Sequence, residues 1–199
     1  MARKNGTAGR LSRDEWLAQA LDILAREGQA RLRIDTICKA LGVTKGSFYW
    51  HFKDRDDFLH GVVQFWSDRF TNPVMASVSE LEGPAGERLK ALMHTVSEGR
   101  FARYDVSIRA LAAQDPELVT AIVKAVDKRR LAFVGSLFAE LGFEGSEAEM
   151  RARALVAYLS FEESVLAKSS RKDRSRMLDQ FIDVMIQPKF AANRTAQIR

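Results

Sequence analysis

The chain has 199 residues, of which 46% are hydrophobic and 29% charged, and it carries a formal net charge of +5. This composition is typical of a globular protein with a substantial core and excludes a disordered chain. A single cysteine excludes an intramolecular disulfide. We expect a soluble, cytoplasmic protein, because the sequence has neither a membrane-length apolar run nor an apolar leader.

The excess positive charge lies in the N-terminal quarter. Residues 1–55 contain 11 Lys/Arg and 6 Asp/Glu, whereas residues 56–199 contain 20 of each. This distribution favours a nucleic-acid-binding domain joined to a neutral region, although a solvated basic surface would show the same bias. Residues 1–10 are basic and lack periodicity, which predicts a flexible arm that either reaches a minor groove or simply stays disordered.

A first helix is predicted to begin just after Ser12. Ser12 and Glu15 have the spacing of a capping box, and Leu11 and Trp16 have that of a hydrophobic staple. Gly28 provides the stop signal. The apolar residues at helical spacing between these signals are Leu17, Ala20, Leu21 and Leu24.

Residues 34–52 have the pattern of two short helices joined by a tight turn. The first helix has an apolar stripe formed by Ile34, Ile37, Cys38 and Leu41. Gly42 can adopt the left-handed conformation that ends this helix. Thr44 is expected to cap the second helix by accepting a hydrogen bond from the N–H of Gly46 or Ser47. The pattern therefore predicts a helix-turn-helix.

The second of these helices is predicted to bury one face and to expose aromatic residues on the other. Phe48 and Phe52 lie about 40° apart at 100° per residue, so they share the buried face. Tyr49, Trp50 and Lys53 point away from it. Large aromatics beside lysine and glycine suit a helix that enters a DNA major groove. An ordinary helical hairpin with solvated lysines is the alternative.

The segment GVTKGSFYWHFK at 42–53, followed by RDDFL at 55–59, resembles the signature of the tetracycline-repressor (TetR) family of bacterial transcription regulators. The resemblance implies a DNA-binding domain, a larger domain that binds a small-molecule effector, and a homodimer formed by the two C-terminal helices. Effector binding would change the spacing of the two recognition helices and release a near-palindromic double-stranded DNA operator. Repression is the commoner behaviour in the family. The DNA-binding residues that the resemblance implies are Arg33, Thr44, Lys45, Gly46, Ser47, Tyr49, Trp50, His51 and Lys53.

Among these nine residues, the DNA contact is best supported for Lys45 and least supported for Arg33. Lys45 is the best candidate to read a base. Arg33 stands where the family often has a small hydroxyl residue, which weakens the case for a phosphate contact there.

The rest of the chain is also predicted to be helical, which makes the fold class all-α. Residues 1–54 are expected to form the helix-turn-helix domain, and residues 55–199 the regulatory and dimerisation domain. A long helix is expected from Arg55 into the seventies. Ser146 and Glu149 have the spacing of a second capping box. The other expected helices cover 84–103, 104–114, 116–141, 146–167 and, after a polar connection over 169–176, a last helix from 177 to 186.

The resemblance implies an effector pocket between the helices of residues 56–186. The many Phe, Met and Trp residues favour an apolar or aromatic effector, but they would equally fill a dry core. The candidate wall residues are Trp66, Phe70, Met93, Phe101, Tyr104 and Phe133.

No catalytic or metal-binding pattern is present. His51, His60 and His94 are scattered, and no phosphate-binding glycine loop or serine-nucleophile motif occurs. We therefore expect no enzyme activity, no catalytic residues, no metal, no cofactor and no membrane partner. Two alternatives stay open: a regulator controlled by a protein partner without a small-molecule effector, and a helical interaction module whose helix-turn-helix is incidental.

Overall fold

The structure, a computed structural model, describes residues 11–114, 116–165 and 169–188, and these residues form helices and no strands. The all-α fold class is therefore confirmed. The predicted arm at 1–10 and the last residues of the helix expected over 146–167 lie outside the described residues. The helices are α1 (Arg13–Glu27), η1 (Gln29–Arg31), α2 (Ile34–Leu41), α3 (Lys45–His51), α4 (Arg55–Phe70), α5 (Asn72–Ser79), α6 (Ala85–Glu98), α7 (Ala102–Gln114), α8 (Pro116–Glu140), α9 (Gly145–Val165) and α10 (Arg171–Ile186).

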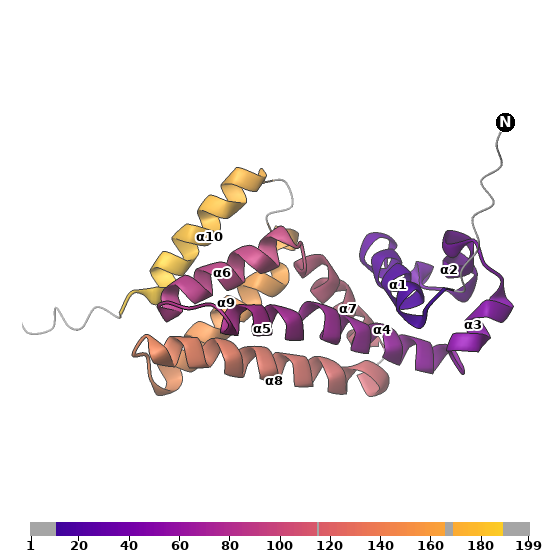
Figure 1. Cartoon of the computed structure of the whole chain (residues 1–199), viewed down its shortest axis with the longest axis horizontal. Helices are drawn as coiled ribbons and strands as arrows, with labels where there is room; N and C mark the ends of the chain where they lie inside the picture. Colours follow the sequence, from indigo (N-terminus) through magenta and orange to yellow (C-terminus); the bar gives the residue numbers. More distant parts are fainter. Residues whose placement is uncertain (1–10, 115, 166–168, 189–199) are drawn as a thin grey trace, which may run out of the picture.

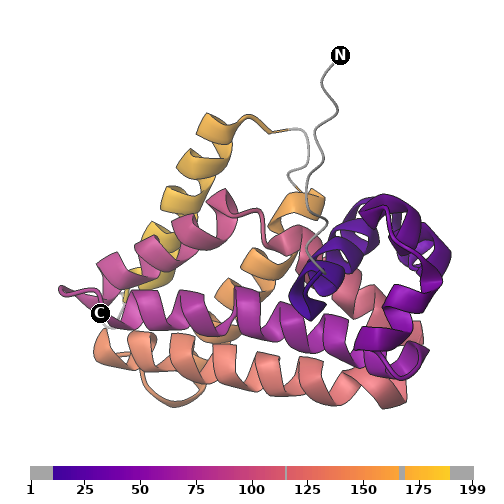
Figure 2. The same ribbon diagram turned by 45° about the vertical axis from the view of Figure 1, so that its right-hand side comes forward.

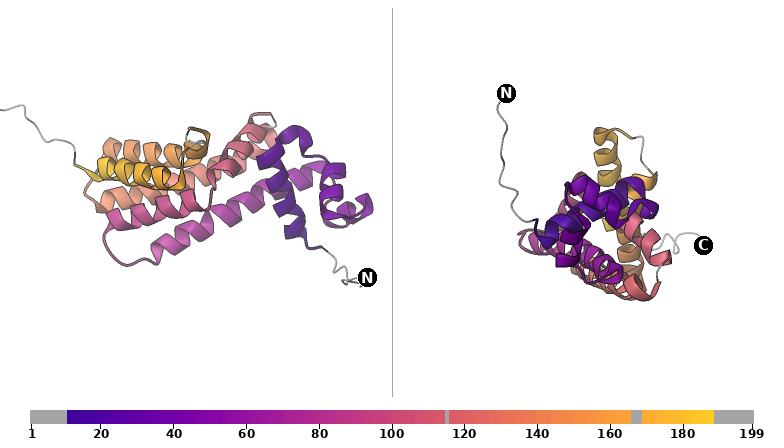
Figure 3. Two further views of the ribbon diagram at one scale, coloured as in Figure 1. Left: turned by 90° about the horizontal axis from the view of Figure 1, so that it is seen from above. Right: turned by 90° about the vertical axis from the view of Figure 1, so that its right-hand side faces the viewer.

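Helices α1 to α3 form a compact group at one end of an elongated molecule, and α10 lies at the other end (Figure 1; Figure 3, left). The predicted start of α1 is confirmed, because Ser12 and Glu15 form the capping box in both directions. The Ser12 backbone N–H donates to Glu15 Oε2 over 2.7 Å, and the Glu15 N–H donates to Ser12 Oγ over 3.3 Å. The predicted end is confirmed at Gly28, whose φ is +80°.

The prediction of one long helix from Arg55 into the seventies is wrong about where that helix ends. Helix α4 ends at Phe70, and Thr71 (φ −118°, ψ −62°) separates it from α5, which carries a proline at its N-terminal end. A proline disfavours helical backbone at the residue before it and cannot donate a helical hydrogen bond. Pro73 therefore accounts for a break that the apolar pattern conceals.

Other expected boundaries also differ. Helix α6 ends at Glu98 rather than 103, and Arg100, with φ of +53°, lies in the turn before α7. Helix α9 begins at Gly145, so Ser146 lies inside the first turn, and Glu149 pairs with Arg153 over 2.6 Å instead of closing a capping box.

The last helix begins six residues earlier than expected. Ser170 caps α10 by accepting from the Asp173 N–H over 3.1 Å, so the residues read as a polar connection form its first turns. A short polar side chain followed three residues later by an acid is a helix start signal. Here that signal outweighs the run of basic residues.

Two hydrophobic clusters make up the core. The first holds the buried residues of α1 to α4 together with Ile108 and Leu111 of α7 and three valines of α8. The second holds buried residues of α5, α6, α8, α9 and α10. Helix α8 runs beside α4 and α5 and enters both clusters (Figure 2). The buried apolar side chains of α4 all belong to the first cluster, whereas those of α5 belong to the second.

Within the described residues, none of the helices combines the length and the apolar character that a membrane crossing requires.

Candidate nucleic-acid interface and effector cavity

The turn between α2 and α3 has the geometry that its sequence predicts. Gly42 adopts the left-handed conformation (φ +69°, ψ +31°), and its N–H donates to the carbonyl groups of Cys38 and Lys39. The Val43 N–H also donates to the Cys38 carbonyl, over 3.0 Å, and the Val43 side chain packs against the first cluster. These bonds satisfy the terminal carbonyl groups of α2 and set the direction in which the chain enters α3.

Helix α3 is anchored by aromatic packing on its buried side. Phe48 is 0% exposed, and its ring lies 5.8 Å from the ring of Trp16 on α1 in an edge-to-face arrangement. Phe52 is also buried, but it caps the C-terminus of α3 instead of lying within the helix. The centroids of the Phe48 and Phe58 rings are 5.3 Å apart, so α3 is held against both α1 and α4.

The outer side of α3 exposes two large aromatic side chains. Tyr49 is 62% exposed and Trp50 is 73% exposed, although each could bury a large apolar area. Of the nine residues predicted to contact DNA, Ser47 and His51 are half-buried and the others are exposed. His51 leans toward α1, where its ring centroid lies 6.2 Å from that of Trp16.

Thr44 occupies the N-cap position of α3 as predicted, but the predicted cap hydrogen bond is wrong. Its side chain makes no cap hydrogen bond; only its backbone carbonyl accepts, from the Ser47 N–H over 3.1 Å. The Thr44 hydroxyl is exposed and so is accessible to a ligand outside the helix.

Lys45 forms an ion pair with Asp35 of α2. Lys45 Nζ lies 2.6 Å from Asp35 Oδ1, and both side chains are about two-thirds exposed. The hydrogen bond to Asp35 and its negative charge raise the pKa of Lys45, which keeps the ammonium group charged. A DNA phosphate at this position would compete with Asp35 for the ammonium group of Lys45.

Gly46 is not required by the packing of the protein itself. A Cβ atom placed there would meet Thr44 Oγ1 at 3.7 Å, which is ordinary contact, and its φ is not in the left-handed region. Glycine weakens a helix relative to alanine. Its presence in this seven-residue helix therefore points to a ligand that approaches the backbone closely from outside.

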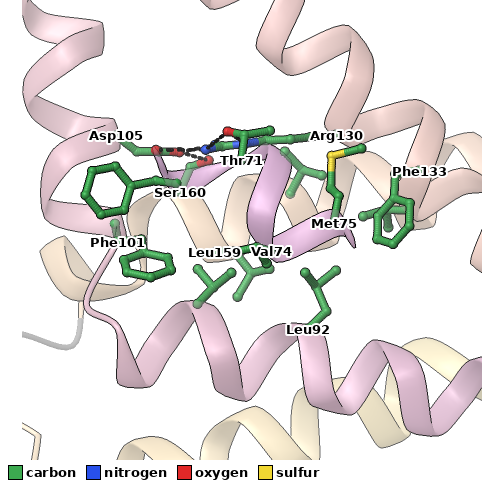
Figure 4. Close-up of a pocket in the computed structure, with 15 residues that line it drawn as sticks. Thr71, Val74, Met75, Leu92, Phe101, Asp105, Arg130, Phe133, Leu159 and Ser160 are labelled. Carbon is green, nitrogen blue, oxygen red and sulfur yellow. Dashed lines mark hydrogen bonds and ion pairs between the residues drawn. The ribbon is translucent and has the colours of Figure 1, made fainter. Parts of the chain in front are cut away.

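A narrow cavity of about 50 Å³ lies in the larger part of the molecule, among α4 to α9 (Figure 4). Most of its wall is apolar, and one end is polar. Three of the predicted wall residues, Phe70, Phe101 and Phe133, do line it. The other lining residues are Thr71, Val74, Met75, Leu92, Val96, Ala102, Asp105, Arg130, Val134, Val156, Leu159 and Ser160.

The other three predicted wall residues do not line this cavity. Trp66 and Met93 are fully buried in the first and second clusters, respectively. Tyr104 stacks on Phe70, with ring centroids 4.7 Å apart. Trp66 and Met93 therefore fill the dry core, which was the alternative to lining an effector pocket.

The polar end of the cavity is a buried cluster built from four helices and the break between α4 and α5. Asp105 of α7 is 3% exposed and forms an ion pair with Arg130 of α8. Arg130 also donates to Thr71 Oγ1 from Nε (3.2 Å) and Nη2 (2.9 Å). Ser160 Oγ of α9 and Trp66 Nε1 of α4 donate to Asp105 over 3.0 and 2.9 Å. We call Thr71, Asp105, Arg130 and Ser160 the polar cluster.

Helices α9 and α10 carry apolar side chains on their surface. Met150 and Phe161 of α9 are 49% and 44% exposed, and Val184 of α10 is 66% exposed. Tyr158 of α9 stacks on Phe181 of α10 with ring centroids 4.3 Å apart, which joins the two helices.

A search of protein-family models finds a match over residues 17–62, from α1 into α4, to a family described as bacterial regulatory proteins, tetR family. This range contains the turn, the buried Phe48 and the exposed face of α3. Over this range, the chain is similar to the TetR family.

Two relatives and one solved structure are also similar to this chain. The HTH-type transcriptional regulator AcrR of Shigella flexneri is 40% identical over 57 residues, which span 29% of this chain and 26% of AcrR. The nucleoid occlusion factor SlmA of Haemophilus ducreyi is 28% identical over 152 residues, covering 71% of this chain and 73% of SlmA. The crystal structure of a TetR transcriptional regulator from Legionella pneumophila has the same fold, with a TM-score of 0.76, 14% identity, and coverage of 94% of this chain and 100% of that one.

The polar cluster is the part of the candidate site that the sequence analysis did not predict. Asp105 lies three residues from both Ala102 and Ile108, on the buried stripe of α7. A charged residue in such a position predicts a buried ion pair. That signal was present in the sequence, but it does not identify Arg130 as the partner. No group of three or more His, Cys, Asp or Glu side chains capable of holding a metal ion occurs in the described part of the chain.

Proposed function

We propose that the chain is a dimeric transcriptional repressor that binds a near-palindromic operator through residues 1–54 and is released by a small-molecule effector bound by residues 55–199. The observation that carries the DNA-binding part is the outer face of α3, where Tyr49 and Trp50 are exposed beside Lys45 while Phe48 anchors the helix. An aromatic and basic helix face held rigidly on a small domain is suited to a major groove.

The exposed apolar residues of α9 and α10 support the proposed dimer. Met150, Ala157 and Phe161 share one face of α9, and Met177 and Val184, seven residues apart, share one face of α10. Two copies of such a surface can pair as a four-helix bundle. Recognition helices in a dimer of this kind would enter successive major grooves about 34 Å apart.

The cavity supports the proposed effector site. It lies beside the break between α4 and α5, and α4 leads directly from the cavity to α3. An apolar cavity of about 150 Å³ admits a benzene ring, so an effector must enlarge the present one. Enlargement would move Phe70 and Thr71 at the end of α4, and that movement could alter the spacing of the two α3 helices.

The experiment that tests the proposal is the selection of bound fragments from the source genome by the purified protein. Enrichment of a near-palindrome, with affinity falling steeply as salt rises, would support a dimeric regulator. The absence of any enriched sequence would contradict the DNA-binding proposal.

Replacement of Lys45 by alanine should weaken binding to the selected operator by about ten- to a hundred-fold, because a lysine that contacts a base or a phosphate contributes directly to binding. Fluorescence anisotropy with labelled operator measures this change. Lys90→Ala is the matched control, since Lys90 forms a similar exposed ion pair, 2.9 Å from Asp183. It belongs to α6, which lies far from α3 (Figure 1). Equal affinity of the Lys45→Ala variant and the unaltered protein would remove Lys45 from the DNA-binding face.

Replacement of Gly46 by alanine should separate folding from DNA binding. We expect the variant to be as stable as the parent or more stable, by up to about 1 kcal/mol, because alanine favours helix over glycine. Its operator affinity should fall at least several-fold, because the added methyl group points outward from α3. The control is Gly135→Ala in α8, where an added Cβ meets nothing within 4 Å. Thermal unfolding and anisotropy measure the two effects; unchanged affinity would show that DNA does not approach Gly46 closely.

A second candidate is a DNA-binding protein that is controlled by a protein partner. One observation favours it: the cavity is small. A partner-controlled protein would bind its DNA site in the presence of any small molecule, whereas the effector proposal requires at least one that releases it.

A further inference from the structure

The polar cluster at the end of the cavity has unused hydrogen-bond donors on its cation and on one hydroxyl group, whereas its carboxylate has no unused acceptor site. The Asp105 carboxylate accepts four hydrogen bonds: Oδ1 from Trp66 Nε1 (2.9 Å) and Arg130 Nη2 (3.3 Å), and Oδ2 from Ser160 Oγ (3.0 Å) and Arg130 Nη1. A carboxylate offers about four lone-pair sites. Asp105 therefore has no acceptor capacity left for a ligand.

Arg130 and Thr71 retain donor capacity. Arginine carries five N–H groups, of which Arg130 uses Nε, both N–H groups of Nη2 and one of Nη1 on Thr71 and Asp105. Thr71 Oγ1 accepts two of these bonds, and among the described residues its hydroxyl donates to none. One Nη1–H and one hydroxyl O–H are thus free beside an apolar wall.

The charges at this end of the cavity already compensate each other. Asp105 is 3% exposed, and the side chain of Arg130 is 16% exposed, so the pair is shielded from water. A ligand cation would add an uncompensated buried charge. A ligand carboxylate would compete with Asp105 for Arg130 and leave one of the two carboxylates unpaired.

We propose that this cavity takes a neutral, largely apolar molecule that carries one oxygen acceptor, such as a carbonyl group, bound by the Thr71 hydroxyl and the free N–H of Arg130. The inference rests on the proposed effector site and names the class of its ligand. Met75, Phe101 and Phe133 line the narrow cavity, and their side chains are only partly buried. They border the same space as the polar cluster (Figure 4). Met75 is unbranched and adapts readily to a new neighbour, so the apolar body of the ligand can enter by displacing these side chains.

Calorimetric titration of the full chain without DNA tests the proposal with four probes of similar size: acetophenone, α-methylstyrene, benzoate and benzylammonium. α-Methylstyrene has the shape of acetophenone but a CH₂ group in place of the carbonyl oxygen. We expect acetophenone to bind at least about ten-fold more tightly than each of the other three, because only it satisfies the free donors without adding charge.

A pair of threonine variants locates the interaction. Thr71→Val keeps the side-chain shape and removes the hydroxyl, so it should abolish most of the preference for acetophenone over α-methylstyrene. Thr95→Val, an identical change at an exposed position on α6, should leave the preference unchanged. If Thr71→Val fails to fold, the four-probe series on the unaltered protein still decides the question.

Equal binding of acetophenone and α-methylstyrene, tighter binding of either charged probe, or no binding of any probe would each overturn the proposal. Its failure can be distinguished from failure of the proposed function because the titrations contain no DNA. Acetophenone binding without operator release would preserve the ligand class and contradict the effector role. Operator release by a charged compound would preserve the effector role and contradict the ligand class.

Discussion

Replacement of Trp16 by alanine should lower the free energy of unfolding by about 3–5 kcal/mol, which is the usual cost of truncating a fully buried tryptophan. Trp16 is 0% exposed and its ring contacts those of Phe48 and Phe52, at 5.8 and 6.4 Å. Its loss leaves a void between α1 and α3. Urea unfolding followed by circular dichroism measures the change.

Trp50→Ala is the matched control, because the same substitution occurs there on the exposed face of α3. We expect the stability of that variant to change by less than about 1 kcal/mol, while operator binding should fall strongly. The opposite pattern, a stable Trp16→Ala variant or a Trp50→Ala variant that unfolds, would contradict the assignment of buried and exposed faces in this domain.

Replacement of Asp105 by leucine should also destabilise the chain, by about 3–5 kcal/mol, because it leaves the Arg130 guanidinium in a shielded site without its counter-ion. The side chains of Trp66 and Ser160 would lose their acceptor at the same time. Denaturant unfolding measures the effect. Combining Asp105→Leu with Arg130→Met should recover part of the loss, since apolar residues of similar size replace a buried ion pair at little net cost.

Asp183→Leu provides the comparison for this experiment. Asp183 pairs with Lys90 at the surface, where an ion pair contributes little to stability. If the Asp105→Leu variant were no less stable than the Asp183→Leu variant, the polar cluster would not contribute to folding. If the double variant were less stable than Asp105→Leu alone, Arg130 would have a structural role apart from its pairing with Asp105.

Local features of the fold were predictable because they depend on neighbours in the sequence. The capping box at Ser12, the left-handed glycine at Gly42 and the burial of Phe48 follow from hydrogen bonds and helical periodicity within a few residues. The exposure of Tyr49 and Trp50 follows from the same periodicity, since they point about 100° or more away from Phe48 around α3. The start of α10 also had a local signal at Ser170, but the polar composition of the segment obscured it.

Other features required the packed chain. Asp105 and Arg130 are 25 residues apart on different helices, and no short-range rule pairs them. The pairing of Lys45 with Asp35 depends on the angle between α2 and α3. The addition of α7 and α8 residues to the first hydrophobic cluster depends on where these helices pack against α1 and α4.

The sequence by itself determined the all-α class, the helix-turn-helix and the two faces of α3. The reason is that hydrogen bonding along one helix and the 3.6-residue periodicity of its apolar residues are encoded locally. Only the tertiary structure decided which aromatic residues fill the core and which line the cavity. Trp66, Met93 and Phe101 have similar apolar character, yet the first two are buried in the core and Phe101 borders the cavity. The reason is that a cavity is space that several helices leave between them, and its position depends on contacts between residues far apart in the chain.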